Sequence, residues 1–166
     1  KESEELYQKA FALKNKIRTK YGDCCCAKHF TEKNGKKPEE LLFNDPDCKE
    51  LFIVVDEIIA MPQHRFIISF DEYGDTKGIS ELSDISRLLE MYVESLIADK
   101  KYGEAFTYCN KISALFDGVD DMSSASGIHS SLCYQENILA GLVLKVSSDP
   151  KYLEQFKISL ERLDKA

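Results

Sequence analysis

The sequence lacks tryptophan and any apolar run long enough to cross a bilayer, and it contains only four prolines. A membrane-spanning helix needs about 20 consecutive apolar residues, so we expect no membrane segment. The polar start over residues 1–5 also lacks the apolar core of a signal peptide. The 166 residues are 43% apolar and 31% charged, as in an ordinary globular domain. We therefore predict one domain over residues 1–166, and the missing initiator methionine predicts that it is a fragment of a larger protein.

Recognisable catalytic motifs are also absent. The chain contains no Gly-x-Ser-x-Gly elbow, no His-Glu-x-x-His and no Gly-x-x-x-x-Gly-Lys loop. A cysteine–histidine pair could be composed from residues 24–26 and one of the three histidines, but no spacing singles one out. We therefore predict no catalytic residue, no cofactor and a non-enzymatic function.

The six cysteines form no Cys-x-x-Cys pair and no disulfide framework; they are Cys24, Cys25, Cys26, Cys48, Cys109 and Cys133. This pattern predicts free thiols in a reducing intracellular compartment, the cytoplasm or nucleus. Zinc is the alternative, because Cys26 and His29 with a second thiol of the run and Cys48 could supply four ligands. A structural zinc site normally presents two close ligand pairs, however, and only one is present. We therefore predict no metal.

Charge is distributed unevenly along the chain. Residues 1–40 carry ten Lys/Arg against seven Asp/Glu, whereas residues 41–166 carry twelve against twenty-two. An acidic body repels phosphates, so nucleic acid is not expected as a partner and a basic protein segment is favoured. The first helix carries Lys9, Lys14, Lys16, Arg18 and Lys20. We interpret these cations as a solvated face, with contact to an anionic membrane or nucleic acid as the alternative.

Apolar residues recur at helical spacing almost throughout, which predicts an all-α fold. Asp45 followed by Pro46 is typical of a helix start, and Met61-Pro62 of its end. Between them lies a broad apolar face, made by Leu51, Phe52, Val54, Val55, Ile58 and Ile59. The β-branched and aromatic run over 65–70 would suit a strand as well. We assign it to a helix, because a lone strand would have no partner.

Residues 85–116 show the clearest pattern, two amphipathic helices joined by a tight turn, the first starting at Ser80. Apolar residues of the first helix fall on one stripe: Ile85, Leu88, Leu89, Tyr92, Val93, Leu96 and Ile97. The second helix, with Tyr102 followed by a small residue at Ala105 and Tyr108 a turn later, resembles the second helix of a tetratricopeptide-like repeat. The resemblance implies stacked antiparallel helical hairpins, as in an α-solenoid. A further hairpin is expected over 132–163, but its spacing is not that of a regular repeat, so an irregular helical bundle is the alternative.

The hairpin pattern leads to a functional hypothesis. A stack of helical hairpins leaves a groove on one side, so the resemblance implies a protein-interaction scaffold that recognises a peptide or helix of a partner protein. We predict that the partner, expected to be basic, contacts the outer face of the first hairpin helix through Arg87, Glu90, Met91 and Glu94. The alternative is a self-associating or obligate heteromeric subunit that uses the apolar 52–70 region.

Overall fold

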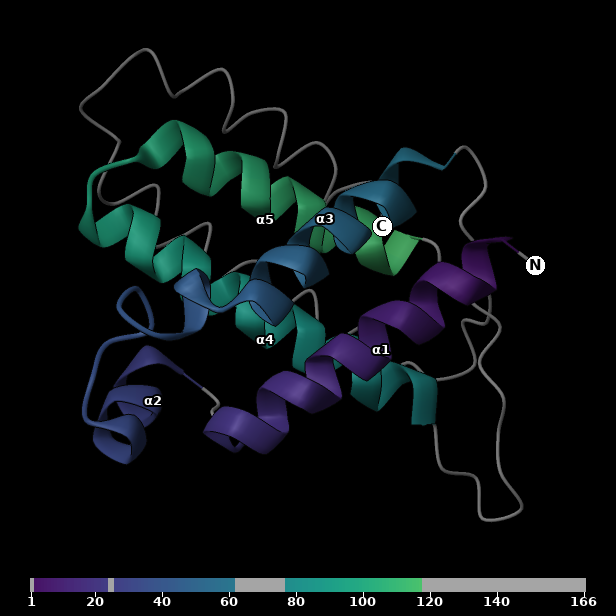
Figure 1. Cartoon of the computed structure of the whole chain (residues 1–166). Helices are drawn as coiled ribbons and strands as arrows, with labels where there is room; N and C mark the ends of the chain where they lie inside the picture. The colour runs from purple at the N-terminus through teal and green to yellow at the C-terminus, as the bar shows by residue number, and fades with distance from the viewer. Residues whose placement is uncertain (1, 24–25, 62–76, 118–166) are drawn as a thin grey trace.

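Five α-helices and one short 3₁₀ helix make up the part of the chain that the computed structural model describes, residues 2–23, 26–61 and 77–117 (Figure 1). These three ranges contain no strand, so the all-α prediction is confirmed. The expected helix over 65–70 and the further hairpin over 132–163 lie outside the described residues.

The four long helices form two packed pairs. α1 (Glu2–Tyr21) lies along α3 (Pro46–Ala60), and α4 (Lys77–Ala98) lies along α5 (Tyr102–Asp117). Contacts from α1 to α4 and from α3 to α5 join the pairs. Figure 1 shows that successive long helices reverse direction, so the arrangement is an antiparallel bundle, and α4 and α5 form the expected hairpin.

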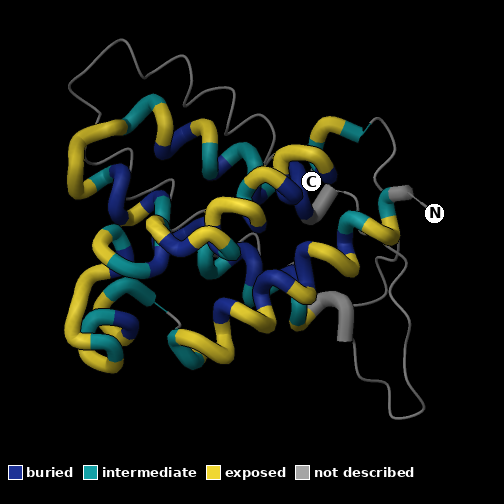
Figure 2. Tube along the Cα trace, viewed as in Figure 1, coloured by how far each residue is buried: buried dark blue, intermediate teal, exposed yellow. Residues whose placement is uncertain are grey.

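Each long helix turns an apolar stripe toward the centre of the bundle (Figure 2). The stripe predicted for α3 is confirmed in its main members, because Leu51, Val54, Val55 and Ile58 are fully buried. Ala105 of α5 is also fully buried, in the same core cluster. Burial of a large aliphatic side chain contributes about 1.5–3 kcal/mol, so these stripes hold the helices together.

Asp45 starts α3 as predicted and also ties it to α1. Its carboxylate accepts a hydrogen bond from the Asp47 backbone N–H at 2.8 Å, which caps the helix. The same carboxylate accepts from Lys20 Nζ at 3.0 Å and from the Tyr21 hydroxyl at 2.8 Å. Burial alone would raise the pKa of Asp45, but the hydrogen bonds from Lys20, Tyr21 and the Asp47 N–H outweigh it and lower the pKa. The end of α1 is thereby fixed against the start of α3.

The short helix α2 (Ala27–Asn34) closes one end of the bundle. It is anchored by Phe30, which is buried with its ring centroid 5.5 Å from that of Tyr21. The Asn34 side-chain amide donates to the Tyr21 carbonyl at 3.4 Å. The 3₁₀ helix η1 (Leu42–Asn44) follows and leads into α3. α2 is thus held against the C-terminal end of α1.

The expected start of the first hairpin helix at Ser80 is wrong. α4 begins at Lys77, so Ser80 lies within the helix and is exposed. An exposed serine costs a helix only a few tenths of a kcal/mol, so this residue does not have to mark a helix end.

The turn between α4 and α5 places a lysine where glycine is usual. Lys100 has a φ of 60°, in the left-handed region. The Lys101 N–H donates to the Leu96 carbonyl at 2.8 Å, and the Lys100 N–H donates to the Ile97 carbonyl at 3.0 Å. This hydrogen-bond pattern is a Schellman motif, in which glycine normally takes the left-handed position because it has no Cβ. Lys100 is therefore a strained residue in an otherwise well-formed turn.

We expect Lys100→Gly to raise the free energy of unfolding by about 0.5–1 kcal/mol, because glycine relieves the left-handed strain. Urea denaturation followed by circular dichroism measures the change. Lys101→Gly is the matched control, since the neighbouring residue has no positive φ, and it should give no stabilisation. A fall in stability for Lys100→Gly would show that the Lys100 side chain itself stabilises the turn.

Candidate binding pocket

The four residues predicted to contact a partner do not form one exposed face. Glu90 and Met91 are buried, Arg87 is partly buried, and only Glu94 is exposed. The prediction of a common outer surface is therefore wrong for Glu90 and Met91. Met91 is covered because α4 contacts α1 as well as α5, and it lines a cavity together with side chains of α1. Glu90 lies close enough to Cys109 of α5 for its charge to raise the pKa of that thiol.

Glu94 supports α2. The Ala27 backbone N–H donates a hydrogen bond to the Glu94 carboxylate. The residue at the N-cap of α2, Cys26, makes no side-chain capping bond. A helix N-terminus leaves backbone N–H groups without partners, so an acidic side chain from another helix can satisfy one of them. Glu94 therefore has a structural role, and whether it also meets a partner stays a prediction.

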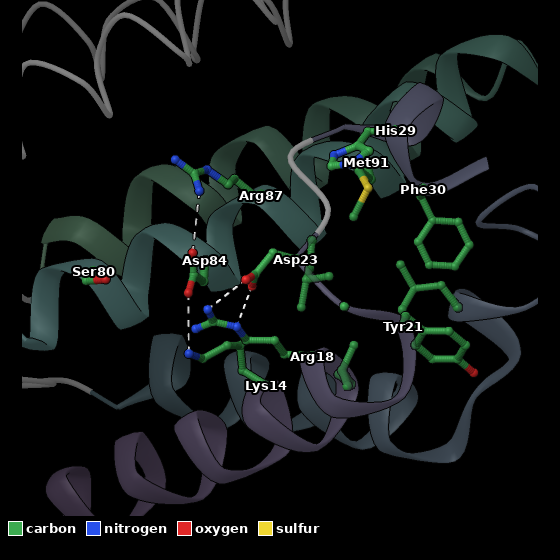
Figure 3. Close-up of a pocket in the computed structure, with 14 residues that line it drawn as sticks. Lys14, Arg18, Tyr21, Asp23, His29, Phe30, Ser80, Asp84, Arg87 and Met91 are labelled. Atoms are coloured by element: carbon green, nitrogen blue, oxygen red, sulfur yellow. Dashed lines mark hydrogen bonds and ion pairs between the residues drawn. The ribbon is translucent and has the colours of Figure 1, made fainter. Parts of the chain in front are cut away.

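A cavity of about 400 Å³ lies between the C-terminal half of α1, α2 and the first turns of α4 (Figure 3). Its volume is in the range of pockets that take small ligands or side chains. Five apolar side chains line it, all buried except the half-buried Leu88; they are Ile17, Phe30, Leu42, Leu88 and Met91. Its polar lining includes Lys14, Arg18, Tyr21, Asp23, His29, Ser80, Asp84 and Arg87. Two of the four predicted residues, Arg87 and Met91, thus belong to this pocket.

Two groups of ion pairs line the pocket (Figure 3). Asp84 accepts from Lys14 Nζ at 3.4 Å through one carboxylate oxygen, and its other oxygen lies 3.5 Å from Arg87 Nη1. Lys14 also pairs with Glu81. At the C-terminal end of α1, Arg18 pairs with Asp23 through two nitrogens, with Nη2 2.7 Å from the carboxylate. The pocket is therefore apolar at its buried part and charged where it meets solvent.

The interpretation of α1 as a solvated cationic face is wrong for Lys14 and incomplete for the others. The Lys14 side chain is only 4% exposed. The remaining cations pair within the fold, Lys9 with Glu50 at 2.9 Å and Lys20 with Asp47 at 2.6 Å. The basic first helix thus meets the acidic part of the chain internally. None of the helices in the described ranges is long and apolar enough to cross a membrane.

The burial of Lys14 could have been predicted from the sequence. Lys14 lies one turn after Ala10 and one turn before Ile17, on the buried stripe of α1. A charged residue on such a stripe needs an opposite charge nearby. Glu81 and Asp84, three residues apart on one helix, could have been recognised as that partner. No comparable signal pointed to His29 or Phe30.

Cys48 and Cys109 are free thiols. Both are buried, as expected for core residues, and burial raises the pKa of each to about 12. Among the described residues, no three histidine, cysteine or acidic side chains are grouped so as to hold a metal ion. Cys24 and Cys25 lie outside the described residues, so the role of the cysteine run stays a prediction.

Glu90 is the most perturbed acid that the structure describes in α4. Burial raises its pKa to about 7, although the positive charge of Arg87 and a hydrogen bond from Ser86 act in the opposite direction. Ser86 Oγ lies 3.5 Å from the carboxylate. The negative charge of Glu94 raises the pKa further. Glu90 is thus a buried carboxyl whose pKa lies near neutrality, and no basic residue of the described part of the chain forms an ion pair with it.

Comparison with known proteins gives no match, because no family model, no curated protein and no solved structure is similar to this chain. The resemblance of residues 85–116 to a tetratricopeptide-like repeat therefore stays a prediction. The pocket and its charged and apolar side chains are the features that indicate a function.

We expect Lys14→Met to destabilise the domain by about 1–3 kcal/mol, because it removes a buried ammonium and leaves Glu81 and Asp84 with one cation fewer. Lys9→Met on the same helix is the matched control. Its ion pair is half exposed, so it should change the free energy of unfolding by less than about 1 kcal/mol. Chemical denaturation of both variants tests this, and equal effects would contradict the structural role of Lys14.

Glu90→Gln should stabilise the domain at high pH and leave it unchanged at low pH. The pKa of the folded state, about 7, lies above the ordinary value of 4.5. Charging Glu90 therefore costs stability progressively as pH rises from 4.5 to 7, and the cost is complete above 7. The variant should gain up to about 3 kcal/mol over wild type at pH 8.5 and close to nothing at pH 4.5.

Denaturation curves at the two pH values measure this difference. Glu104→Gln, at an exposed position of α5, is the control and should give a difference that does not change with pH. A Glu90→Gln effect equal at both pH values would mean that the pKa of Glu90 in the folded state is not raised above its ordinary value.

Proposed function

We propose that this domain is a non-catalytic protein-interaction module that recognises a peptide or helix of a partner protein through the pocket between α1, α2 and α4. The observation that carries the proposal is the combination of a buried apolar lining with an exposed charged edge. His29, Arg18 and Asp23 are exposed, while Ile17, Phe30 and Met91 are buried. Protein interfaces share this anatomy, an apolar centre surrounded by a polar rim.

The polar groups of the pocket favour binding over catalysis. Lys14, Arg18, Asp23 and Asp84 are all engaged in ion pairs with one another or with a neighbour. Such pairs fix side chains in place and present charge to a ligand.

The self-association alternative depends on the 52–70 region. In the described part of this region, Phe52 and Ile59 pack against the core, and Ile53 is 58% exposed. Single exposed apolar residues are normal on monomeric proteins, whereas interfaces usually need a contiguous patch. The pocket offers several apolar side chains at one place, so we favour it as the recognition site.

A random peptide library displayed on phage and panned against the full chain tests the proposal. Retained peptides should bind Leu88→Ala about fivefold to thirtyfold more weakly than wild type, because Leu88 is the half-buried apolar member of the pocket. Fluorescence anisotropy with labelled peptides measures the affinities, and thermal melting checks that each variant is folded.

Ile53→Ala is the matched control, since it also removes a partly exposed aliphatic side chain but lies on α3 outside the pocket. It should leave the affinities unchanged. Loss of binding in Ile53→Ala, with Leu88→Ala unaffected, would move the interface to α3. A library from which no peptide is retained would contradict the proposed function.

A further inference from the structure

We propose that the pocket receives an acidic segment, in which an aspartate or glutamate side chain stands beside a bulky apolar residue. This inference rests on the proposed function and specifies the chemistry of the partner. It replaces the basic partner expected from the net charge of −7, because the charges that matter at the pocket are local.

The cations of the pocket outnumber its carboxylates. Lys14, Arg18 and Arg87 line the cavity together with only two acids, Asp23 and Asp84. Lys14 is already neutralised, since it pairs with both Asp84 and Glu81 and is almost completely buried. Arg18 and Arg87 are different, with side chains 52% and 39% exposed. Both are therefore accessible to an incoming ligand, as is Asp23, the ion-pair partner of Arg18, whose side chain is 69% exposed.

Arg87 has unused hydrogen-bonding capacity. Its ion-pair partner among the described residues is Asp84, and the 3.5 Å contact through Nη1 is long for a charge-assisted hydrogen bond. Arg87 Nε is buried and has no hydrogen-bond acceptor among the described residues. A buried donor without an acceptor costs about 1–3 kcal/mol. A hydrogen-bond acceptor placed closer to the guanidinium would therefore stabilise Arg87.

Asp84 permits Arg87 to change partner. Its second oxygen keeps the contact to Lys14, so Asp84 would stay paired if Arg87 turned toward a ligand. A ligand carboxylate could then accept two parallel hydrogen bonds from the guanidinium, which is the favoured geometry for this pair. Arg18 stands on the opposite helix and supplies a second positive charge.

The preference for an apolar residue beside the ligand carboxylate follows from the side chains near Arg87. Leu88 and Met91 come one and four residues later on α4 and line the same cavity. Methionine has a flexible side chain that adapts to different apolar shapes. A ligand that places its carboxylate at Arg87 thus has apolar surface within one helical turn. A lysine or arginine side chain would meet Arg18 and Arg87 as like charges.

Two displayed peptide libraries with identical apolar positions test the inference, one with only Asp and Glu at its charged positions and the other with only Lys and Arg. We expect the full chain to retain peptides from the acidic library alone. In a retained peptide, replacing the acidic residue by Asn or Gln should weaken binding about tenfold or more. Arg87→Gln and Arg18→Gln should each cause a similar loss for the acidic peptide and little for its amide version.

The control is Lys9→Gln, which makes the same change in net charge on α1 outside the pocket and should leave both affinities unchanged. The ion pair of Arg18 with Asp23 is exposed, so Arg18→Gln should fold and remains informative if Arg87→Gln does not. Retention from the basic library, or from both libraries equally, would overturn the inference and leave peptide recognition standing. Retention from neither would overturn the proposed function itself.

Discussion

The burial of the Lys14 ammonium between α1 and α4 is the interaction on which the arrangement of the bundle depends. An unpaired buried charge costs several kcal/mol, so Lys14 can occupy its position only while Glu81 and Asp84 stand opposite. Apolar stripes bring helices together but tolerate sliding, because one aliphatic contact resembles the next. A single group of ion pairs on such a stripe prevents sliding, because it fixes the position at which α1 meets α4.

The same group of charges defines the pocket. Asp84 joins the buried Lys14 to the partly exposed Arg87, so the side chain that positions the helices also holds one wall of the cavity. The opposite wall depends on Tyr21, whose hydroxyl is fixed by Asp45 at the start of α3. The residues that line the pocket thus also hold the helices together, and the bundle fixes the position of both walls.

The sequence predicted the helices well and the site poorly, for physical reasons. Periodicity depends on neighbours along one chain segment, so the stripe of α3 and the Asp45 cap were readable from local sequence. The assignment of Arg87, Glu90, Met91 and Glu94 to an outer face assumed that a hairpin helix has one covered side. α4 contacts both α5 and α1, and the position of α1, which depends on contacts far along the chain, covers the side on which Met91 lies.

Lys14 and its partner Asp84 are separated by 70 positions. Ribosomes add about 5–20 residues per second, so α1 exists for roughly 4–14 s before that acid is synthesised. During this interval α4, which forms one wall of the pocket, does not yet exist. Of the two long helices that α1 contacts, only α3 can then cover its apolar stripe. α1, although made before the other described helices, therefore reaches its final position late, only when α4 has left the ribosome.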